Sequence, residues 1–424
     1  MLKKILNNKE LLWTVFAQAL QMTSGVVLIK LLTSNLSLEG YGTFSLVMAA
    51  SAFVLTLPFS AFQQGFYRYR STYLKKGKGE DFYSSMIYGL VALIIIYILL
   101  AYGTTRSFFE KEVWHTHFPI IALFISTEVI KIYVRAIVNA DRNRKLYSFA
   151  IVAEFSSKLV FVWCYFILSI IDEFYIFLLY SISNMISILI CMRGYLINLK
   201  LINWVTFYEV WKKTLTFSTP LLIWAVFGWS RDSSLRWFIE AKLGTSDVAV
   251  FTAITSIGVI IPLALQSLVS AYIIPILYQK DEGKSREKLD EKFSYFIRIL
   301  YMIGIIGFAF LYMFSEVLVG LLTDSKYVGY AWSLPWVFIS YYLFCCAMIN
   351  ATTLLVNYDT KSLLYPNLLS GVATPIIVLL AGEKFSLKLA ISAYAISYLI
   401  YFSVTTIIVY KSRLKGNDNI IEEQ

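Results

Sequence analysis

Apolar segments long enough to cross a lipid bilayer recur along the whole chain. A membrane-spanning helix needs about 20 mostly apolar residues. Twelve such segments can be placed, at residues 11–32, 41–62, 82–102, 118–138, 147–170, 174–193, 216–239, 248–277, 293–314, 331–356, 362–382 and 387–410. Only 15% of the residues are charged, whereas soluble domains average about 25%. The sequence therefore predicts an all-α polytopic membrane protein with about twelve transmembrane helices.

Lysine and arginine are distributed unequally between the two sides of the predicted bundle. If the N-terminus is cytoplasmic, the cytoplasmic segments contain 24 of these residues and the opposite side contains 6. Positive charge is typical of cytoplasmic loops. We therefore predict that both termini are cytoplasmic and that the number of spans is even.

The two halves of the chain have the same size and layout. Residues 248–252 open the eighth span much as residues 41–45 open the second, and Pro58 recurs as Pro262. Six spans separate these copies, a pattern typical of parallel repeats with a site between them near mid-depth. We predict a six-helix lobe, a cytoplasmic connecting segment, a second six-helix lobe and a cytoplasmic tail, at residues 1–195, 196–215, 216–410 and 411–424.

Ten charged residues fall inside the predicted spans, where charge is costly and usually faces a bundle interior or a watery cavity. They are Lys30, Glu128, Lys131, Arg135, Glu154, Lys158, Arg231, Asp232, Arg236 and Arg298. Three pairs are three or four residues apart and so share a helix face, namely Glu128 with Lys131, Glu154 with Lys158, and Asp232 with Arg236. Seven cations and three anions cannot all be neutralised in this way.

Several of these residues also have purely structural interpretations. Lys30 and Arg298 lie near span ends, where long side chains can reach the interface. Arg135 can belong to the cytoplasmic basic cluster that follows it, and Glu154 with Lys158 can form a closed ion pair without a ligand. Arg231 lies about two turns from either interface, so we interpret it as lining a central cavity.

A cavity with surplus arginine and lysine would accept an anionic ligand. The planar guanidinium group binds two phosphate oxygens at once and stays charged at any physiological pH. Trp224, Trp229 and Trp237 lie near Arg231 in sequence and could stack on sugar rings. The residues thus indicate a transporter for an anionic ligand that bears phosphate and sugar.

Two longer cytoplasmic segments, residues 63–81 and 193–215, combine aromatic and cationic residues. Segments of this kind lie in the headgroup layer and attract anionic lipid. The alternative is that they act only as topology signals.

No metal site is expected. The two histidines, His115 and His117, lack a third ligand nearby, and the four cysteines fall in apolar segments without metal-ligand spacing. We predict no catalytic residue and no cofactor other than a coupling proton or Na⁺.

Three stretches resemble Wzx-type polysaccharide (O-antigen) flippases of the multidrug/oligosaccharidyl-lipid/polysaccharide (MOP) exporter superfamily. The first contains Gln18, Gln21, residues 31–32 and residues 40–46. The second contains residues 217–221, 228–229, 233–236 and 243–244. The third contains residues 321–323, 326–327, 331–332 and 334–335.

The resemblance implies a MATE-like fold with two lobes around a cationic cavity, in the bacterial cytoplasmic (inner) membrane. It implies that polyprenyl-pyrophosphate-linked oligosaccharide, an O-antigen, capsule or exopolysaccharide unit, moves to the outer leaflet as residues 1–195 rock against 216–410. Membrane lipids and a polysaccharide polymerase or other assembly proteins would be partners, and nucleic acid would not. The expected substrate-binding residues are Arg231, Arg236, Lys131, Arg135, Lys158 and Arg298, and the expected ion-coupling residues are Glu128, Glu154 and Asp232.

One position departs from the family pattern. Members often carry an acidic residue immediately before the arginine that corresponds to Arg236, but Leu235 stands there and the nearest acid is Asp232.

Three alternatives remain open. A MATE-like exporter of small cations would favour an acidic cavity, and a lipid II flippase usually has two further spans. A membrane-embedded polysaccharide polymerase or ligase generally needs a large outer loop, and the predicted outer loops, residues 103–117 and 315–330, are short.

Overall fold

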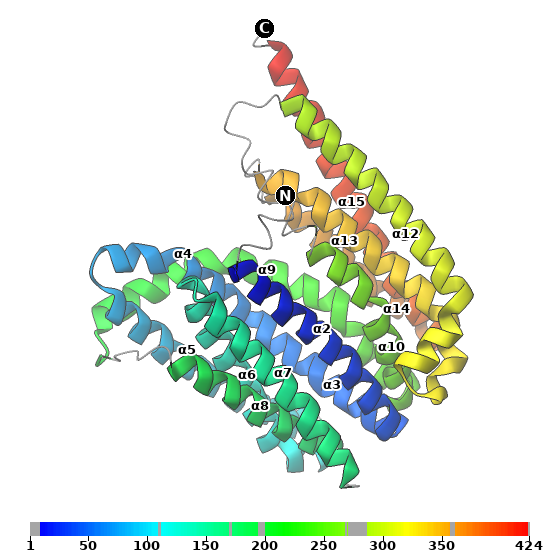
Figure 1. The fold of residues 1–424 in the computed structure, drawn as a ribbon, viewed down its shortest axis with the longest axis horizontal. Helices are drawn as coiled ribbons and strands as arrows, with labels where there is room; N and C mark the ends of the chain where they lie inside the picture. Colours follow the sequence, from blue (N-terminus) through cyan, green and yellow to red (C-terminus); the bar gives the residue numbers. More distant parts are fainter. Residues whose placement is uncertain are drawn as a thin grey trace. The chain divides into compact units, whose positions relative to one another are not determined.

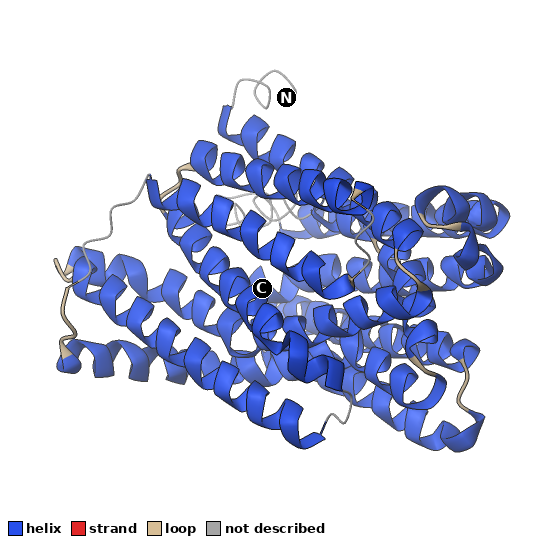
Figure 2. Cartoon of the chain, turned by 90° about the horizontal axis from the view of Figure 1, so that it is seen from below, coloured by secondary structure: helices blue, strands red, loops and turns tan. Residues whose placement is uncertain are grey.

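In the computed structural model the chain is helical. The structure describes residues 9–108, 112–168, 172–193, 200–267, 269, 286–356 and 361–422. All regular secondary structure within these ranges is helix, and Figure 2 shows the helices joined by short loops. The predicted all-α fold class is confirmed. The last part of the predicted span 248–277 lies largely outside the described residues.

The chain divides into two compact units, which we call unit 1 (Met1–Ala225) and unit 2 (Val226–Gln424). Among its described residues, unit 1 contains seven complete helices and the beginning of an eighth, which Figure 1 labels. They are α2 (Lys9–Asn35), α3 (Leu38–Val54), α4 (Ala61–Lys75), α5 (Gly79–Phe108), α6 (Glu112–Ala140), α7 (Arg144–Ile167), α8 (Glu173–Arg193) and α9 (Trp204–Leu243), with a π-helical turn η1 (Leu55–Ser60) between α3 and α4.

Unit 2 contains the end of α9 and five further α-helices among the described residues. They are α10 (Thr245–Gly258), α12 (Arg286–Leu322), α13 (Leu334–Val356), α14 (Leu364–Ala381) and α15 (Leu387–Glu422). Short 3₁₀ turns η3 (Ser325–Ser333), η4 (Lys361–Leu363) and η5 (Gly382–Lys384) precede α13, α14 and α15. Helix α15 packs against both α13 and α14, whereas in unit 1 α8 packs against α6 and α7.

Local sequence signals explain several of the helix boundaries. The Ser37 hydroxyl accepts a hydrogen bond of 2.9 Å from the Gly40 amide, and the Asn143 side chain accepts one of 3.2 Å from the Leu146 amide. These side chains cap α3 and α7, because the first amides of a helix have no partner within it. Gly244 joins α9 to α10 with φ at 102°, a conformation that favours glycine.

Ten helical segments in the described part of the chain are long and apolar enough to cross a membrane, and the chain is a multi-pass membrane protein. The predicted spans 118–138 and 216–239 lie in α6 and α9, which have 29 and 40 residues. These two helices are not among the ten. Both are long enough, but both carry a group of charged residues, and these groups form the candidate site.

The two segments that the sequence predicts to be cytoplasmic, residues 63–81 and 193–215, contain helix in much of their described part. Residues 63–75 belong to α4, and residues 204–215 form the beginning of α9. Helix α4 packs against α5 through aromatic rings. The Phe66 and Tyr73 rings lie 5.8 and 5.0 Å from that of Phe82. Charge in these segments therefore did not prevent regular structure, because their aromatic residues have a partner to pack against.

Candidate functional site

Helices α6 and α7 each present charged side chains at helical spacing. Glu128, Lys131 and Arg135 follow one face of α6, and Glu154 and Lys158 follow one face of α7. Residues three and four apart are neighbours on a helix surface. The packing of α6, α7 and α8 against one another brings the two faces together.

Glu154 lies at the centre of this group. Its Oε1 atom is 2.8 Å from Lys131 Nζ and 2.5 Å from Lys158 Nζ, and its Oε2 atom is 2.5 Å from Arg135 Nη2. Only 1% of its surface is exposed. The predicted pair of Glu154 with Lys158 is confirmed, and two further cations share the same carboxylate.

Glu128 completes the group from α6. Its Oε2 atom is 2.6 Å from Lys131 Nζ, which confirms the second predicted pair, and its Oε1 atom is 3.6 Å from Lys158 Nζ. We call Glu128, Lys131, Arg135, Glu154 and Lys158 the unit 1 charge cluster.

Polar side chains of α8 also bind the cluster. Asn184 Oδ1 accepts a hydrogen bond of 3.0 Å from Lys131, and the Ser187 hydroxyl accepts one of 3.0 Å from Arg135 Nε. The ring of Tyr180 lies 4.8 Å from Lys158 Nζ. These three residues are not among the site residues predicted from the sequence. Asn184, a buried amide in an otherwise apolar span, was the signal that could have found them.

The unit 1 charge cluster contains three cations and two carboxylates, so it has a surplus of one positive charge. Burying charge is costly, and pairing reduces that cost only where opposite charges meet. Arg135 and Glu128 keep 13% of their side chains exposed, while those of Lys131, Glu154 and Lys158 are less than 9% exposed. An anion that approached Arg135 would complete the neutralisation of the cluster.

In unit 2, Arg231 is buried with an exposed fraction of 3%. Its Nε and Nη2 atoms donate to the two carboxylate oxygens of Asp232 at 2.7 and 3.3 Å, and Nη1 donates to Asn367 Oδ1 at 3.0 Å. The Tyr398 hydroxyl donates to Asp232 Oδ1 at 2.7 Å. Four residues from α9, α14 and α15 thus form one hydrogen-bonded group.

Aromatic rings surround the Arg231 guanidinium group. The ring centroids of Phe344, Tyr398 and Tyr401 lie 4.5, 5.1 and 4.9 Å from its Cζ atom. A cation over an aromatic face at these distances is attracted by the ring quadrupole. The structure therefore places Arg231 within unit 2 under three rings, and the carboxylate of Asp232, with 44% of its side chain exposed, is the more accessible member of the pair.

Arg236 and Arg298 lie in different surroundings. Arg236 donates to the Thr252 hydroxyl and to the backbone carbonyl of Asp232, each at 3.1 Å. The ion pair that the structure shows for the Asp232 carboxylate is with the adjacent Arg231, whereas the sequence spacing predicted Arg236. Arg298 is exposed on α12, and Leu235 is buried.

In the described residues, no three histidine, cysteine, aspartate or glutamate side chains gather as metal ligands would. His117 lies 3.6 Å from Asp172 and stacks on Phe174 at 4.1 Å. All four cysteines are free thiols.

Residues 8–281 match a family model described as polysaccharide biosynthesis protein. A comparison with curated protein sequences finds no significant match. Solved structures with similar folds include an inward-facing MATE family multidrug resistance transporter of the MOP superfamily. It has a TM-score of 0.70 at 15% identity over 94% of this chain and 96% of that chain.

Two other similar structures come from the same comparison. One is the lipid II flippase MurJ in an inward closed conformation, with a TM-score of 0.65 at 14% identity over 95% of this chain and 87% of that chain. The other is a MOP superfamily transporter from Pyrococcus furiosus, with a TM-score of 0.59 at 14% identity over 95% and 94%. At these identities the likeness concerns the fold.

Proposed function

We propose that this chain, which belongs to the polysaccharide biosynthesis protein family and to the MOP superfamily, is a flippase for polyprenyl-pyrophosphate-linked oligosaccharide. In this proposal it works in the bacterial inner membrane with both termini cytoplasmic, and it moves the sugar-lipid to the outer leaflet by alternating access. The transporter fold and the family support the assignment of the chain as a transporter or flippase. The substrate class is our inference.

The observation that supports this substrate is the positive surplus of the unit 1 charge cluster. A diphosphate cannot cross hydrocarbon without compensating charge. Lys131, Arg135 and Lys158 offer three cations against two carboxylates. Arg135 is the most accessible of the three, and we assign it the first contact with the phosphate.

The remaining predicted residues have secondary roles in the proposal. Arg236 would assist binding from unit 2, and Arg231 would act through Asp232, which it holds in place. Glu128, Glu154 and Asp232 stay the candidates for coupling to a proton or Na⁺. A polysaccharide polymerase would receive the translocated product.

The test is complementation of a bacterial strain that lacks its own polysaccharide flippase, scoring lipid-linked oligosaccharide in each leaflet. The wild-type protein should clear the sugar-lipid from the cytoplasmic leaflet. Arg135→Gln, which removes the surplus charge, should slow clearance roughly tenfold or more, because a hydrogen bond to a charged group contributes about 1.5–3 kcal/mol. Arg135→Lys keeps the charge and should retain most of the activity.

Other outcomes would replace the proposal. Sugar-lipid that reaches the outer leaflet without the protein, yet stays unpolymerised or unattached, would indicate a polymerase or ligase. Resistance to cationic drugs conferred by the protein, without any change in sugar-lipid distribution, would indicate a MATE-like exporter of small molecules. Equal clearance by the wild type and Arg135→Gln would leave the flippase but remove Arg135 from the substrate path.

A further inference from the structure

The beginning of α9 is a helix whose apolar side faces outward. Thr206, Val210 and Thr214 are buried on its inner face. Trp204, Val205 and Tyr208 are 70%, 79% and 66% exposed, and Lys212 and Leu215 continue the same exposed face. We call Trp204, Val205, Tyr208, Lys212 and Leu215 the outer stripe of α9.

The inner face is fixed on unit 1, so the outer stripe has a defined direction. Trp211 Nε1 donates a hydrogen bond of 3.0 Å to the Ser85 carbonyl of α5, and the Trp211 and Phe62 rings lie 5.2 Å apart. The Tyr73 hydroxyl of α4 donates to Glu209 at 3.2 Å. Because α4 and α5 hold this segment, rotation of the helix cannot bury the outer stripe.

The length of α9 places its first residues, 204–215, at the edge of the hydrocarbon layer. Helix α9 has 40 residues, which corresponds to about 60 Å at the usual rise per residue, whereas the hydrocarbon core is about 30 Å thick. If residues 216–239 cross the core, residues 204–215 lie beyond it. Exposed tryptophan and tyrosine are enriched at that depth, where one end of the ring is apolar and the other is wet.

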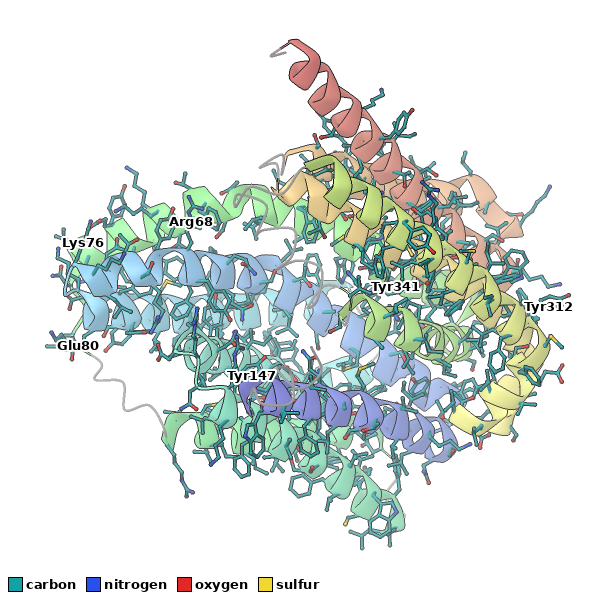
Figure 3. All side chains as sticks on the ribbon, turned by 45° about the horizontal axis from the view of Figure 1, so that its top comes forward. Arg68, Lys76, Glu80, Tyr147, Tyr312 and Tyr341 are labelled. Atoms are coloured by element: carbon teal, nitrogen blue, oxygen red, sulfur yellow. The ribbon has the colours of Figure 1, made fainter. Side chains whose placement is uncertain are left out.

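Several lysines lie near the beginning of α9. Lys75, Lys76 and Lys78 are exposed where α4 turns into α5, and Figure 3 shows Lys76 and Glu80 together at that end of unit 1. The Tyr73–Glu209 bond ties this turn to α9. Lys212 lies within the stripe, 5.8 Å from the Tyr208 ring.

Two of the three acids at this end, Glu80 and Glu209, have lysine partners already, and the third, Asp81, lies in the first turn of α5. Lys200 binds Glu80 at 2.8 Å, and Lys213 binds Glu209 at 2.6 Å. The hydrogen bond from Lys213 lowers the pKa of the Glu209 carboxyl. Among the described residues, the ion pairs of this region involve Lys200 and Lys213, so Lys75, Lys76, Lys78 and Lys212 keep their charge for an outside partner.

We propose that the outer stripe of α9 lies in the headgroup layer of the cytoplasmic leaflet and that the lysines around it bind anionic phospholipid. An exposed apolar face flanked by cations fits such a surface, because the rings enter the acyl boundary while the ammonium groups meet lipid phosphates. A protein partner or a second copy would not need this concentration of positive charge. The docked helix fixes the height of unit 1 in the membrane.

The test uses the full chain with Cys164→Ser, which removes the exposed thiol, reconstituted into vesicles of phosphatidylcholine and phosphatidylglycerol. A nitroxide label is attached at Val205→Cys or, as a control outside this group of lysines, at Lys145→Cys, an exposed position at the start of α7. Collision rates with oxygen and with a water-soluble nickel chelate give the depth of each label. The Val205 label should lie about 5–10 Å below the lipid phosphates, while the Lys145 label should stay accessible to nickel.

A second comparison tests whether the charges of the lysines and of the anionic lipid determine the depth of the label. Vesicles of phosphatidylcholine alone should bring the Val205 label closer to water, and Lys212→Gln in the mixed vesicles should shift it in the same direction. Each lysine removed should lower the local preference for phosphatidylglycerol roughly fivefold. A depth that is the same in both vesicles would overturn the role of anionic lipid.

Three results would overturn the docking itself. A Val205 label as accessible to nickel as the Lys145 label would place the stripe in water. A label shielded from both reagents would show that protein covers it, and a label near the bilayer centre would make the segment part of a span. These readouts do not depend on translocation, so they separate this proposal from the proposed function.

Discussion

Glu154 joins the two helices of the unit 1 charge cluster, because its two oxygens contact three cations at 2.5–2.8 Å. Without it, Glu128 would be the one carboxylate left in the cluster against Lys131, Arg135 and Lys158. Uncompensated buried charge is among the largest penalties that a single substitution can create. The cluster is thus a structural element as well as a candidate binding site.

Glu154→Gln should therefore destabilise the protein strongly. Breaking one side of a buried ion pair costs about 3–5 kcal/mol, whereas an exposed pair contributes about 0–1 kcal/mol. Glu80→Gln, which breaks the exposed pair with Lys200, is the matched control. Thermal unfolding of both variants in the same detergent measures the difference, and similar unfolding temperatures would show that the cluster does not stabilise the fold.

In unit 2, Tyr398→Phe should weaken the group around Arg231. The substitution removes the hydroxyl that donates to Asp232 at 2.7 Å but keeps the ring over the guanidinium group. Hydrogen bonds to charged groups contribute about 1.5–3 kcal/mol. Tyr410→Phe, at an exposed position of the same helix, should leave the unfolding temperature unchanged, and an equal loss in both variants would contradict the assigned hydrogen bond.

At the scale of the helix, the packing of α9 on α5 depends on one glycine. A Cβ atom at Gly89 would lie 1.9–2.3 Å from three ring atoms of Trp211. The absence of a side chain at Gly89 lets the indole reach the Ser85 carbonyl. Glycine is used here for close approach rather than for an unusual backbone conformation.

Gly89→Ala should consequently displace Trp211 and cost about 1–3 kcal/mol, the usual penalty of overpacking. Gly103→Ala in the same helix meets no atom within 4 Å and should be neutral or stabilising by up to about 1 kcal/mol. Trp fluorescence during denaturant unfolding measures the free energy of unfolding of both variants. If Gly89→Ala and Gly103→Ala were equally stable, α9 would be able to shift without loss of free energy, and its inner face would not be fixed.

At the scale of the whole molecule, the buried charge of unit 1 has the polarity that an anionic substrate requires. The unit 1 charge cluster has three cations and two carboxylates, a surplus of one positive charge. In unit 2, the buried Arg231 pairs with the exposed carboxylate of Asp232. Such a field favours anions and opposes the entry of cationic compounds.

A polyprenyl pyrophosphate should accordingly raise the unfolding temperature of the purified protein. A ligand at 100 times its dissociation constant stabilises the folded state by about 2.7 kcal/mol. The monophosphate, with less charge, should give a smaller shift, and Arg135→Gln should reduce the shift for the pyrophosphate. A larger shift with a cationic drug than with the pyrophosphate would reverse the assigned polarity.

The membrane fold could be predicted from sequence because hydrophobicity over about 20 residues is a local property. The pairs Glu128–Lys131 and Glu154–Lys158 were predictable for the same reason, since helical spacing alone brings their side chains together. Helical spacing did not predict the partner of the Asp232 carboxylate. The adjacent Arg231 pairs with this carboxylate, and Arg236 contacts the backbone carbonyl of Asp232.

The sequence alone determined that the chain is a helical membrane protein, and it showed which of its long apolar segments carry charged residues. The tertiary structure alone decided that Glu154 joins cations from two helices, that Asn184 completes this group, and that rings from α13 and α15 surround Arg231. Those of these contacts that join different helices connect residues 19 to 170 positions apart. Helix packing sets them, and no local pattern encodes which faces of distant helices will meet.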